Sequence, residues 1–355
     1  MSAHASIVRE PFGRLQAGGE VQRVVLRNRR GMEAQILTYG GAVMRLTAPD
    51  RRGCYADVVL GHRTLAEYLA NDQYFGAIIG RHANRMAGAR FAIDGVTYHL
   101  AHNCGRHSLH GGVCGFDKVL WNVTDAAVNS SGAQLRLEYV SRDGEQGYPG
   151  TLSVAATYTL SDDDSLRLEC TATTDRPTVV NLTQHSYFNL GDGSDVLGHV
   201  LQIHAQRFTP TDAQQIPTGE LRDVAGTAFD YRQPTAIGAC IGAADEQLRI
   251  ANGYDHNWVI DKPPGTLAVV ASVYEPVSGR RLEVLSNQPG LQFYSGNSLD
   301  GTLRRPDGWS FGFRSGLCLE PQHFPDSPNR PEFPSVVLRP GAVYQNTIIQ
   351  RFTAE

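Results

Sequence analysis

Two segments of the sequence carry groups that could transfer protons at neutral pH. Residues 179–190 form a strand-like run crowded with polar side chains around His185, and residues 316–329 place Glu320 between a short apolar strand and a proline-rich turn. An imidazole titrates near neutral pH, and burial raises the pKa of a carboxyl group toward that range. The two side chains are therefore candidates for a general acid and a general base.

The same two segments also permit a purely structural interpretation. His185 could pack inside a hydrogen-bonded β-arch, because buried polar side chains need partners. Glu320 could point outward at the end of a strand, which is the ordinary place for a glutamate. Taken alone, the residue types leave both interpretations open.

Four further segments carry side chains that suit the hydroxyl groups of a small polar ligand. The candidates are Asn84 and Arg85 in residues 80–88, His110 in residues 107–112, Asp255 in residues 254–258 and Gln292 in residues 292–297. Arginine and the two amides offer several directed hydrogen bonds, which fits a sugar. Residues 80–88 lack the glycine spacing of a phosphate-binding loop, and a turn with structural salt bridges is the alternative interpretation of that segment.

Three histidines within nine positions, His102, His107 and His110, raise the question of a metal site. Metal ligands on one strand recur at i and i+2, and on one helix at i and i+4, whereas His107 and His110 are three positions apart and precede Gly-Gly. No nearby acidic residue or cysteine completes a persuasive ligand set. We therefore expect no metal, and either a loop histidine that donates to a ligand hydroxyl or a structural one.

Composition excludes several classes of protein. Lys and Arg number 32 against 36 Asp and Glu, for a formal charge of −4, and no block of like charges stands out, which disfavours nucleic-acid and anionic membrane surfaces. The N-terminus lacks the apolar region of a secretory signal, and no apolar run approaches the length of a membrane helix. The six cysteines are scattered without a CxxC pair, so we expect free thiols and a cytoplasmic protein.

The elements that must position these side chains are predicted to be strands. The 37 glycines and 18 prolines divide the chain into short apolar runs, many with the two-residue period of a strand. Residues 64–70 alone suggest a helix, with Thr64 as N-cap and Glu67 three positions later. No βαβ alternation, linker or repeat is present, so residues 1–355 are interpreted as one β-sandwich domain. The strands are expected at residues 21–28, 33–46, 95–100, 135–140, 152–160, 165–174, 199–208, 257–261, 267–275, 281–286, 291–296 and 344–352.

In this order, the polar segments resemble the motifs of the aldose 1-epimerase (galactose mutarotase) family. The matching stretches are GRHANR at 80–85, SLHGG at 108–112, NLTQHSYFNL at 181–190, DHN at 255–257, QFYSGN at 292–297 and LEPQ at 319–322 with PD following at 325–326. The match extends from about residue 74 to the C-terminus and is loose before it. The resemblance implies a large antiparallel β-supersandwich with few short helices. It also implies an epimerase that needs no cofactor and interconverts the α and β anomers of a free aldohexose such as galactose or glucose.

The family's site residues fall on positions already singled out. By resemblance, His185 donates a proton and Glu320 accepts one. The substrate-binding positions fall on Asn84, Arg85, His110, Asp255 and Gln292, with Ser186 and Tyr187 adjoining the histidine. The sequence departs from the family at Gln184, Trp258 and Pro321, of which Trp258 and Pro321 could alter the pocket and the preferred sugar. A monosaccharide is the expected partner of a monomer or homodimer.

Other functions would use the same face of a sandwich. A carbohydrate-binding module would hold the sugar without catalysis. A glycoside hydrolase usually needs two carboxylates, and here only Asp255 could assist Glu320. An epimerase acting on a pentose is also compatible with these residues. A sugar phosphate would call for a basic cluster, whereas the candidate pocket offers Arg85 and at most Arg81.

Overall fold

The structure is a computed structural model that describes residues 4–70, 72–191, 195–303 and 310–355. Strands dominate it, and the described residues contain two short α-helices, α1 (Leu65–Leu69) and α2 (Glu246–Ala251). This composition confirms the predicted all-β class. Single 3₁₀ turns occur at Ala87–Ala89, Phe116–Lys118, Glu145–Gly147, Ile237–Ala239 and Ser327–Asn329.

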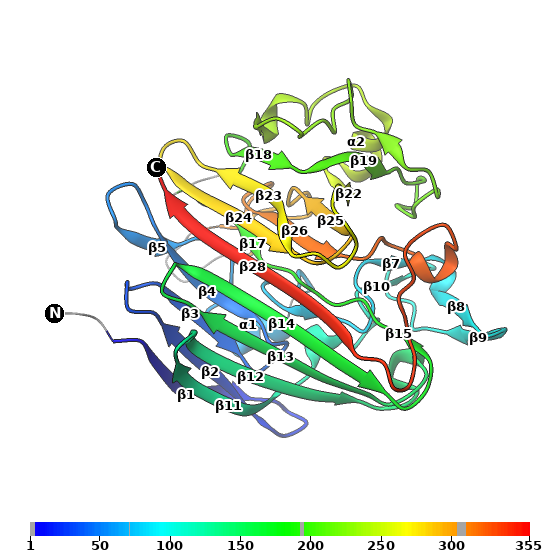
Figure 1. Ribbon diagram of the computed structural model, residues 1–355, viewed down its shortest axis with the longest axis horizontal. Coiled ribbons are helices and arrows are strands. Elements are labelled where there is room, and N and C mark those ends of the chain that lie inside the picture. Colours follow the sequence, from blue (N-terminus) through cyan, green and yellow to red (C-terminus); the bar gives the residue numbers. More distant parts are fainter. Residues whose placement is uncertain (1–3, 71, 192–194, 304–309) are drawn as a thin grey trace.

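A nine-stranded antiparallel sheet runs across the whole molecule (Figure 1). The C-terminal strand lies near its middle, between β14 and β24, so the last residues of the chain complete the sheet. In spatial order its strands are β11 (Asn122–Asn129), β12 (Gly132–Ser141), β13 (Leu152–Leu160), β14 (Ser165–Thr174), β28 (Tyr344–Ala354), β24 (Arg280–Ser286), β23 (Ala268–Tyr274), β18 (Val200–Ile203) and β21 (Thr235–Ala236).

Two smaller antiparallel sheets pack against this large sheet (Figure 1). The six-stranded one has the order β17 (Tyr187–Phe188), β26 (Leu317–Gln322), β25 (Gly290–Tyr294), β22 (Asp255–Ile260), β19 (Ala205–Thr209) and β20 (Arg222–Asp223). The five-stranded one runs in chain order through β1 (Ser6–Arg14), β2 (Glu20–Arg27), β3 (Glu33–Leu37), β4 (Val43–Pro49) and β5 (Tyr55–Asp57). Apolar side chains from all three sheets meet in one hydrophobic cluster, which forms the core of the sandwich.

Four two-stranded pairings account for the remaining described strands. They join β6 (Ile78–Ile79) to β16 (Thr183–Gln184), β7 (Arg85–Met86) to β10 (Ser108–Leu109), β8 (Arg90–Ile93) to β9 (Val96–His99), and β15 (Thr178–Val179) to β27 (Val337–Leu338). The first pairing joins the strand that precedes His185 to residues 78–79, and the second joins the strand of Arg85 to the strand that precedes His110.

The local signals in the sequence correspond closely to the structure in some places and fail in others. The capping box at Thr64 and Glu67 forms as predicted and begins α1. The single strand expected over residues 199–208 is interrupted at His204, with β18 in the large sheet and β19 in the six-stranded one. The run at 33–46 divides into β3 and β4 because Gly40 and Gly41 turn the chain with positive φ. In the described part of the chain, no helix has the length and apolar character that crossing a membrane requires.

Candidate active site

Alternation along three neighbouring strands gathers polar side chains on one face of the six-stranded sheet. On β26 the side chains of Leu317 and Leu319 enter the core, so Cys318 and Glu320 face the opposite way. On β25 the core residues Leu291 and Phe293 leave Gln292 on the same outer face as Glu320. The antiparallel register sets Gln292 directly opposite Glu320. Glu320 is nevertheless only 2% exposed, because loops cover this face.

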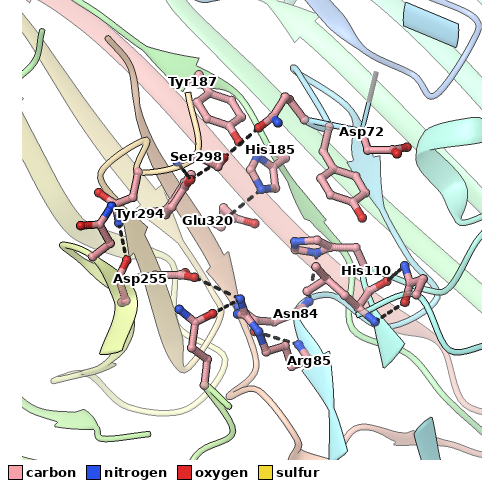
Figure 2. Close-up of a pocket in the computed structure, with 18 residues that line it drawn as sticks. Asp72, Asn84, Arg85, His110, His185, Tyr187, Asp255, Tyr294, Ser298 and Glu320 are labelled. Carbon is pink, nitrogen blue, oxygen red and sulfur yellow. Dashed lines mark hydrogen bonds and ion pairs between the residues drawn. The ribbon is translucent and has the colours of Figure 1, made fainter. Parts of the chain in front are cut away.

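His185 reaches the same place from the segment that joins β16 to β17. Its backbone is fixed on both sides, since its N–H donates to the carbonyl of Ala77 and its carbonyl accepts from the N–H of Gly76. The imidazole Nε2 then lies 3.7 Å from Oε1 of Glu320, and both side chains are buried (Figure 2). Its other nitrogen, Nδ1, lies 3.6 Å from Sγ of Cys318. The two proposed proton-transfer groups are thus adjacent.

Burial acts on both members of this pair in the direction of the uncharged form. It raises the pKa of Glu320 well above its usual range, helped by the charge of Asp255 and opposed by that of Arg85. It lowers the pKa of His185 to about 4, against smaller contributions from a backbone hydrogen bond and from Asp255. When the pair shares one proton, burial therefore favours the arrangement with the proton on the carboxyl group and a neutral His185. Moving that proton to His185 creates the ion pair without changing the number of bound protons.

Arg85 and Asp255 form a polar wall beside the pair. Arg85 Nη2 lies 3.3 Å from Asp255 Oδ2, and Gln292 Nε2 donates to Asp255 Oδ1 at 2.7 Å. Arg85 also donates to the side-chain oxygen of Gln215, a residue that the sequence did not single out. Because Arg85 and Asp255 are largely buried, these contacts fix both charged groups in one orientation (Figure 2).

His110 faces the same cavity as a hydrogen-bond donor. The backbone N–H of Asn84 donates to its Nδ1 at 3.1 Å, so Nδ1 must present a lone pair and the proton of the neutral ring lies on Nε2. Burial, together with the charges of His185 and Arg85, lowers the pKa of His110 well below its usual value. Tyr74, whose ring centroid is 4.7 Å from that of His110, packs across the imidazole and lines the cavity.

We expect His110 to remain neutral with its proton on Nε2 throughout the neutral pH range, because burial lowers its pKa. Protonation would place two N–H groups, those of Nδ1 and Asn84, against each other. Histidine-labelled protein studied by ¹⁵N NMR distinguishes the tautomers directly. A titration of the His110 ring nitrogens above about pH 6 would contradict this assignment.

Three buried ligand atoms come together here in a way that the sequence did not indicate. His110, His185 and Glu320 each offer one atom, and these atoms lie within 4.8 Å of one another. A metal ion needs a lone pair from each ligand, and an imidazole bound through Nε2 usually donates through Nδ1. His110 does the reverse, because its Nδ1 accepts from Asn84. The donor set therefore suits proton transfer and sugar binding better than metal coordination.

The cavity has a volume of about 440 Å³. Of the predicted site residues it is lined by Asn84, Arg85, His110, His185, Tyr187, Asp255 and Glu320. Its wall also contains residues that had not been assigned a role, namely Asp72, Gln73, Tyr74, Asn103, Leu109, Gln215, Ala251, Asn252, Tyr294, Asn297 and Ser298. Several of these residues lie in loops that reach the cavity through contacts between segments distant in the sequence, so local sequence patterns do not reveal them.

Two predicted substrate-binding residues lie behind the wall of the cavity. The hydroxyl of Ser186 accepts a hydrogen bond from Gln184 Nε2 at 2.6 Å, and Gln292 lies beneath Asp255, to which it donates. Neither side chain belongs to the cavity lining. Ser186 was predicted to bind substrate because it follows His185 in the sequence. In the structure its hydroxyl points to Gln184 and away from the cavity.

The three departures from the family motifs also lie outside the cavity lining. Gln184 donates to the carbonyl of Gly76 and accepts from Gln350, so it ties the His185 segment to the large sheet. Trp258 is buried in the core, where its indole N–H donates to the carbonyl of Phe229. Pro321 follows Glu320 on the core side of β26. A direct effect of Trp258 or Pro321 on the pocket wall is therefore not supported.

Comparison with known proteins gives a consistent picture. Residues 22–351 match the family model described as aldose 1-epimerase. The chain is 44% identical to a galactose mutarotase of Rattus norvegicus, covering 98% of this chain and 99% of that protein. It is 38% identical to an aldose 1-epimerase of Escherichia coli, with 95% and 97% covered. A crystal structure of galactose 1-epimerase from Lactobacillus acidophilus superposes with a TM-score of 0.88 at 26% identity, covering 99% of both chains.

Proposed function

Because the chain belongs to the aldose 1-epimerase family, we propose that it interconverts the α and β anomers of a free aldohexose, with galactose and glucose as first candidates. Its reaction class is that of a mutarotase, an isomerase acting on aldoses. The observation that carries the assignment of residues is the 3.7 Å approach of His185 Nε2 to Glu320 Oε1 inside a buried cavity. A base and an acid this close can act on the two neighbouring oxygens of one hemiacetal.

In the proposed reaction Glu320, as carboxylate, removes the proton of the C1 hydroxyl while His185, as imidazolium, donates a proton to the ring oxygen. The bond between C1 and the ring oxygen breaks, and C1 becomes an aldehyde. Rotation about C1–C2 presents the other face, and the two proton transfers then run in reverse as the ring closes. The open-chain stage leaves Glu320 protonated and His185 neutral, which is the state that burial favours. Burial therefore favours the proton transfers once the ion pair has formed, and it opposes formation of the ion pair itself.

The remaining polar residues are proposed to hold the sugar during this exchange. His110 donates from Nε2 to a hydroxyl, and Arg85 and Asn84 offer further donors at the same wall. Asp255, fixed by Arg85 and Gln292, accepts from sugar hydroxyls and sets the orientation of the ring. Such positioning keeps the aldehyde in place until it recloses.

The chain is further proposed to act as a single domain, as a monomer or homodimer in the cytoplasm. The shared hydrophobic cluster of the three sheets supports one domain. Six free thiols, in the described positions of all six cysteines, suit a reducing compartment. A free monosaccharide is the proposed partner, and no cofactor or metal takes part in the steps above.

Polarimetry tests the function. Freshly dissolved α-D-galactose and α-D-glucose should approach their equilibrium rotation faster in proportion to enzyme concentration. A rotation that decays at the spontaneous rate, while calorimetry still detects sugar binding, would favour a binding module instead. Release of reducing sugar from glycosides would point to a hydrolase.

The same assay on D-xylose, L-arabinose and galactose 6-phosphate defines the substrate class. We expect the sugar phosphate to be the poorest substrate, because Arg85 is the one cationic lysine or arginine among the described residues that line the cavity and it already contacts Asp255. Faster turnover of the phosphate than of galactose would overturn the proposal of a neutral sugar.

A further inference from the structure

Polar atoms without partners gather on the buried side of Glu320. Among the residues that the structure describes, both amide atoms of Asn257, both amide atoms of Gln322, Oε1 of Gln292 and Oε2 of Glu320 are buried and make no hydrogen bond to the protein. These four side chains are at most 2% exposed. Buried amides normally have partners, so a concentration of unpartnered ones next to a reacting carboxyl group needs an explanation.

The register shows that these atoms belong to one patch. Asn257 on β22 pairs with Gln292 on β25, and Gln292 pairs with Glu320 on β26. Gln322, two residues beyond Glu320, points to the same face and pairs with Gly290. The four polar side chains therefore surround the position of Gly290 on three adjacent strands.

Gly290 lets the amide of Asn257 lie close against β25. A Cβ atom built at Gly290 would lie 2.3 Å from Oδ1 of Asn257, 2.9 Å from Cδ1 of Phe324 and 3.0 Å from the carbonyl oxygen of Gln322, so the absence of a side chain there makes room for the amide. Neither Asn257 nor Gln322 lines the sugar cavity.

We infer that Asn257 and Gln322 are positioning residues for the reaction: through ordered water in this patch they hold Oε2 of Glu320, so that Oε1 faces His185 and the sugar. The inference rests on the proposed role of Glu320 as the base. Buried water commonly makes about three hydrogen bonds to polar groups that otherwise have none. Amide N–H groups and water donate to a carboxylate and stabilise its charged form, opposing the effect of burial.

Several charged and titratable groups surround Glu320. Asp255 raises and Arg85 lowers the pKa of Glu320, as charges across the cavity. Further titratable neighbours are His185, His110, Tyr187 and Cys318. None of them bonds to Oε2. The amide patch is therefore the proposed source of support for the charged carboxylate at that oxygen.

The variants Asn257→Leu and Gln322→Met test the inference, because each keeps a similar side-chain shape and removes the polar atoms of the amide. Without these donors the reactive ion pair is less populated, so kcat for galactose mutarotation should fall by about tenfold to a hundredfold while KM stays within about twofold. Because the carboxylate of Glu320 is then less stable, Glu320 and His185 together release their shared proton at higher pH. The alkaline limb of the pH profile should therefore move to higher pH.

Gln247→Met is the matched control. Gln247 is an equally buried amide, but it is bonded on both atoms to Thr211 and lies outside the patch. Its loss should lower the midpoint of thermal unfolding and leave kcat and the pH profile of the folded fraction unchanged. Patch variants that behave like this control would overturn the inference.

A high-resolution crystal structure of the unmodified protein provides a test that does not depend on folded variants. We expect an ordered water within hydrogen-bond distance of Glu320 Oε2 and of at least one of the two amides. A dry patch around Oε2 would overturn the inference. Failure of the unmodified enzyme to accelerate mutarotation would instead remove the proposed function, so the two failures are distinguishable.

Discussion

The Glu320→Gln variant is expected to lose about 10² to 10⁴ in kcat for mutarotation of α-D-galactose, the range for removal of one positioned general base. Glutamine has nearly the same shape and keeps β26 in register, but its amide cannot accept the proton of the C1 hydroxyl. KM should change little, because Asn84, Arg85, His110 and Asp255 still line the cavity. Polarimetry at several enzyme concentrations measures both constants.

A second glutamate provides the control for this substitution. Glu283 on β24 lies in the large sheet and forms a salt bridge with Arg351 there. Glu283→Gln should leave kcat and KM unchanged. A Glu320→Gln enzyme that is as fast as Glu283→Gln would exclude Glu320 as the base.

The His185→Asn variant is expected to lose a similar factor of about 10² to 10⁴ in kcat, for a complementary reason. Asparagine keeps a polar group near the position of Nδ1 but removes Nε2, the atom that lies 3.7 Å from Glu320. Without Nε2 no acid reaches the ring oxygen. The bond between C1 and the ring oxygen must then break while that oxygen is unprotonated. The measurement is again the polarimetric kcat, compared across pH.

The exposed His204 offers a matched histidine that lies between β18 and β19. His204→Asn should retain full activity at every pH. If His185→Asn also retained it, the role of acid would have to pass to another group, such as His110.

The sequence predicts most reliably those features whose causes are local. The capping box of α1 needs only Thr64 and Glu67, and both partners form it. The alternation of β26 is also local, and it predicts that Glu320 and Leu319 face opposite sides. The all-β class follows from many such short-range patterns.

Local sequence patterns did not predict the features that depend on contacts between segments far apart in the sequence. Gln215 contacts Arg85 only because a loop with positive φ at Gln215 folds over the cavity. Ser186 and Gln292 stand in motifs of the site, yet Ser186 bonds to Gln184 and Gln292 lies beneath Asp255, so neither lines the cavity. The interruption at His204 reflects the choice of two different partner strands, which no window of sequence specifies.

The tautomer of His110 illustrates the same limit for chemistry. Three histidines close together in the sequence raised the possibility of a metal site. Their spacing alone could not decide whether His110 binds a metal or a ligand hydroxyl. The answer depends on one backbone N–H, that of Asn84, which reaches Nδ1 from the facing segment. A single long-range hydrogen bond thus fixes which nitrogen can face the sugar.

A double variant tests most directly whether Glu320 and His185 pass one proton between them as a unit. If they do, the enzyme with both Glu320→Gln and His185→Asn should have a kcat within about threefold of the slower single variant, because either change already stops the concerted transfer. If the two losses multiply instead, the groups act independently, and the shared-proton mechanism is contradicted.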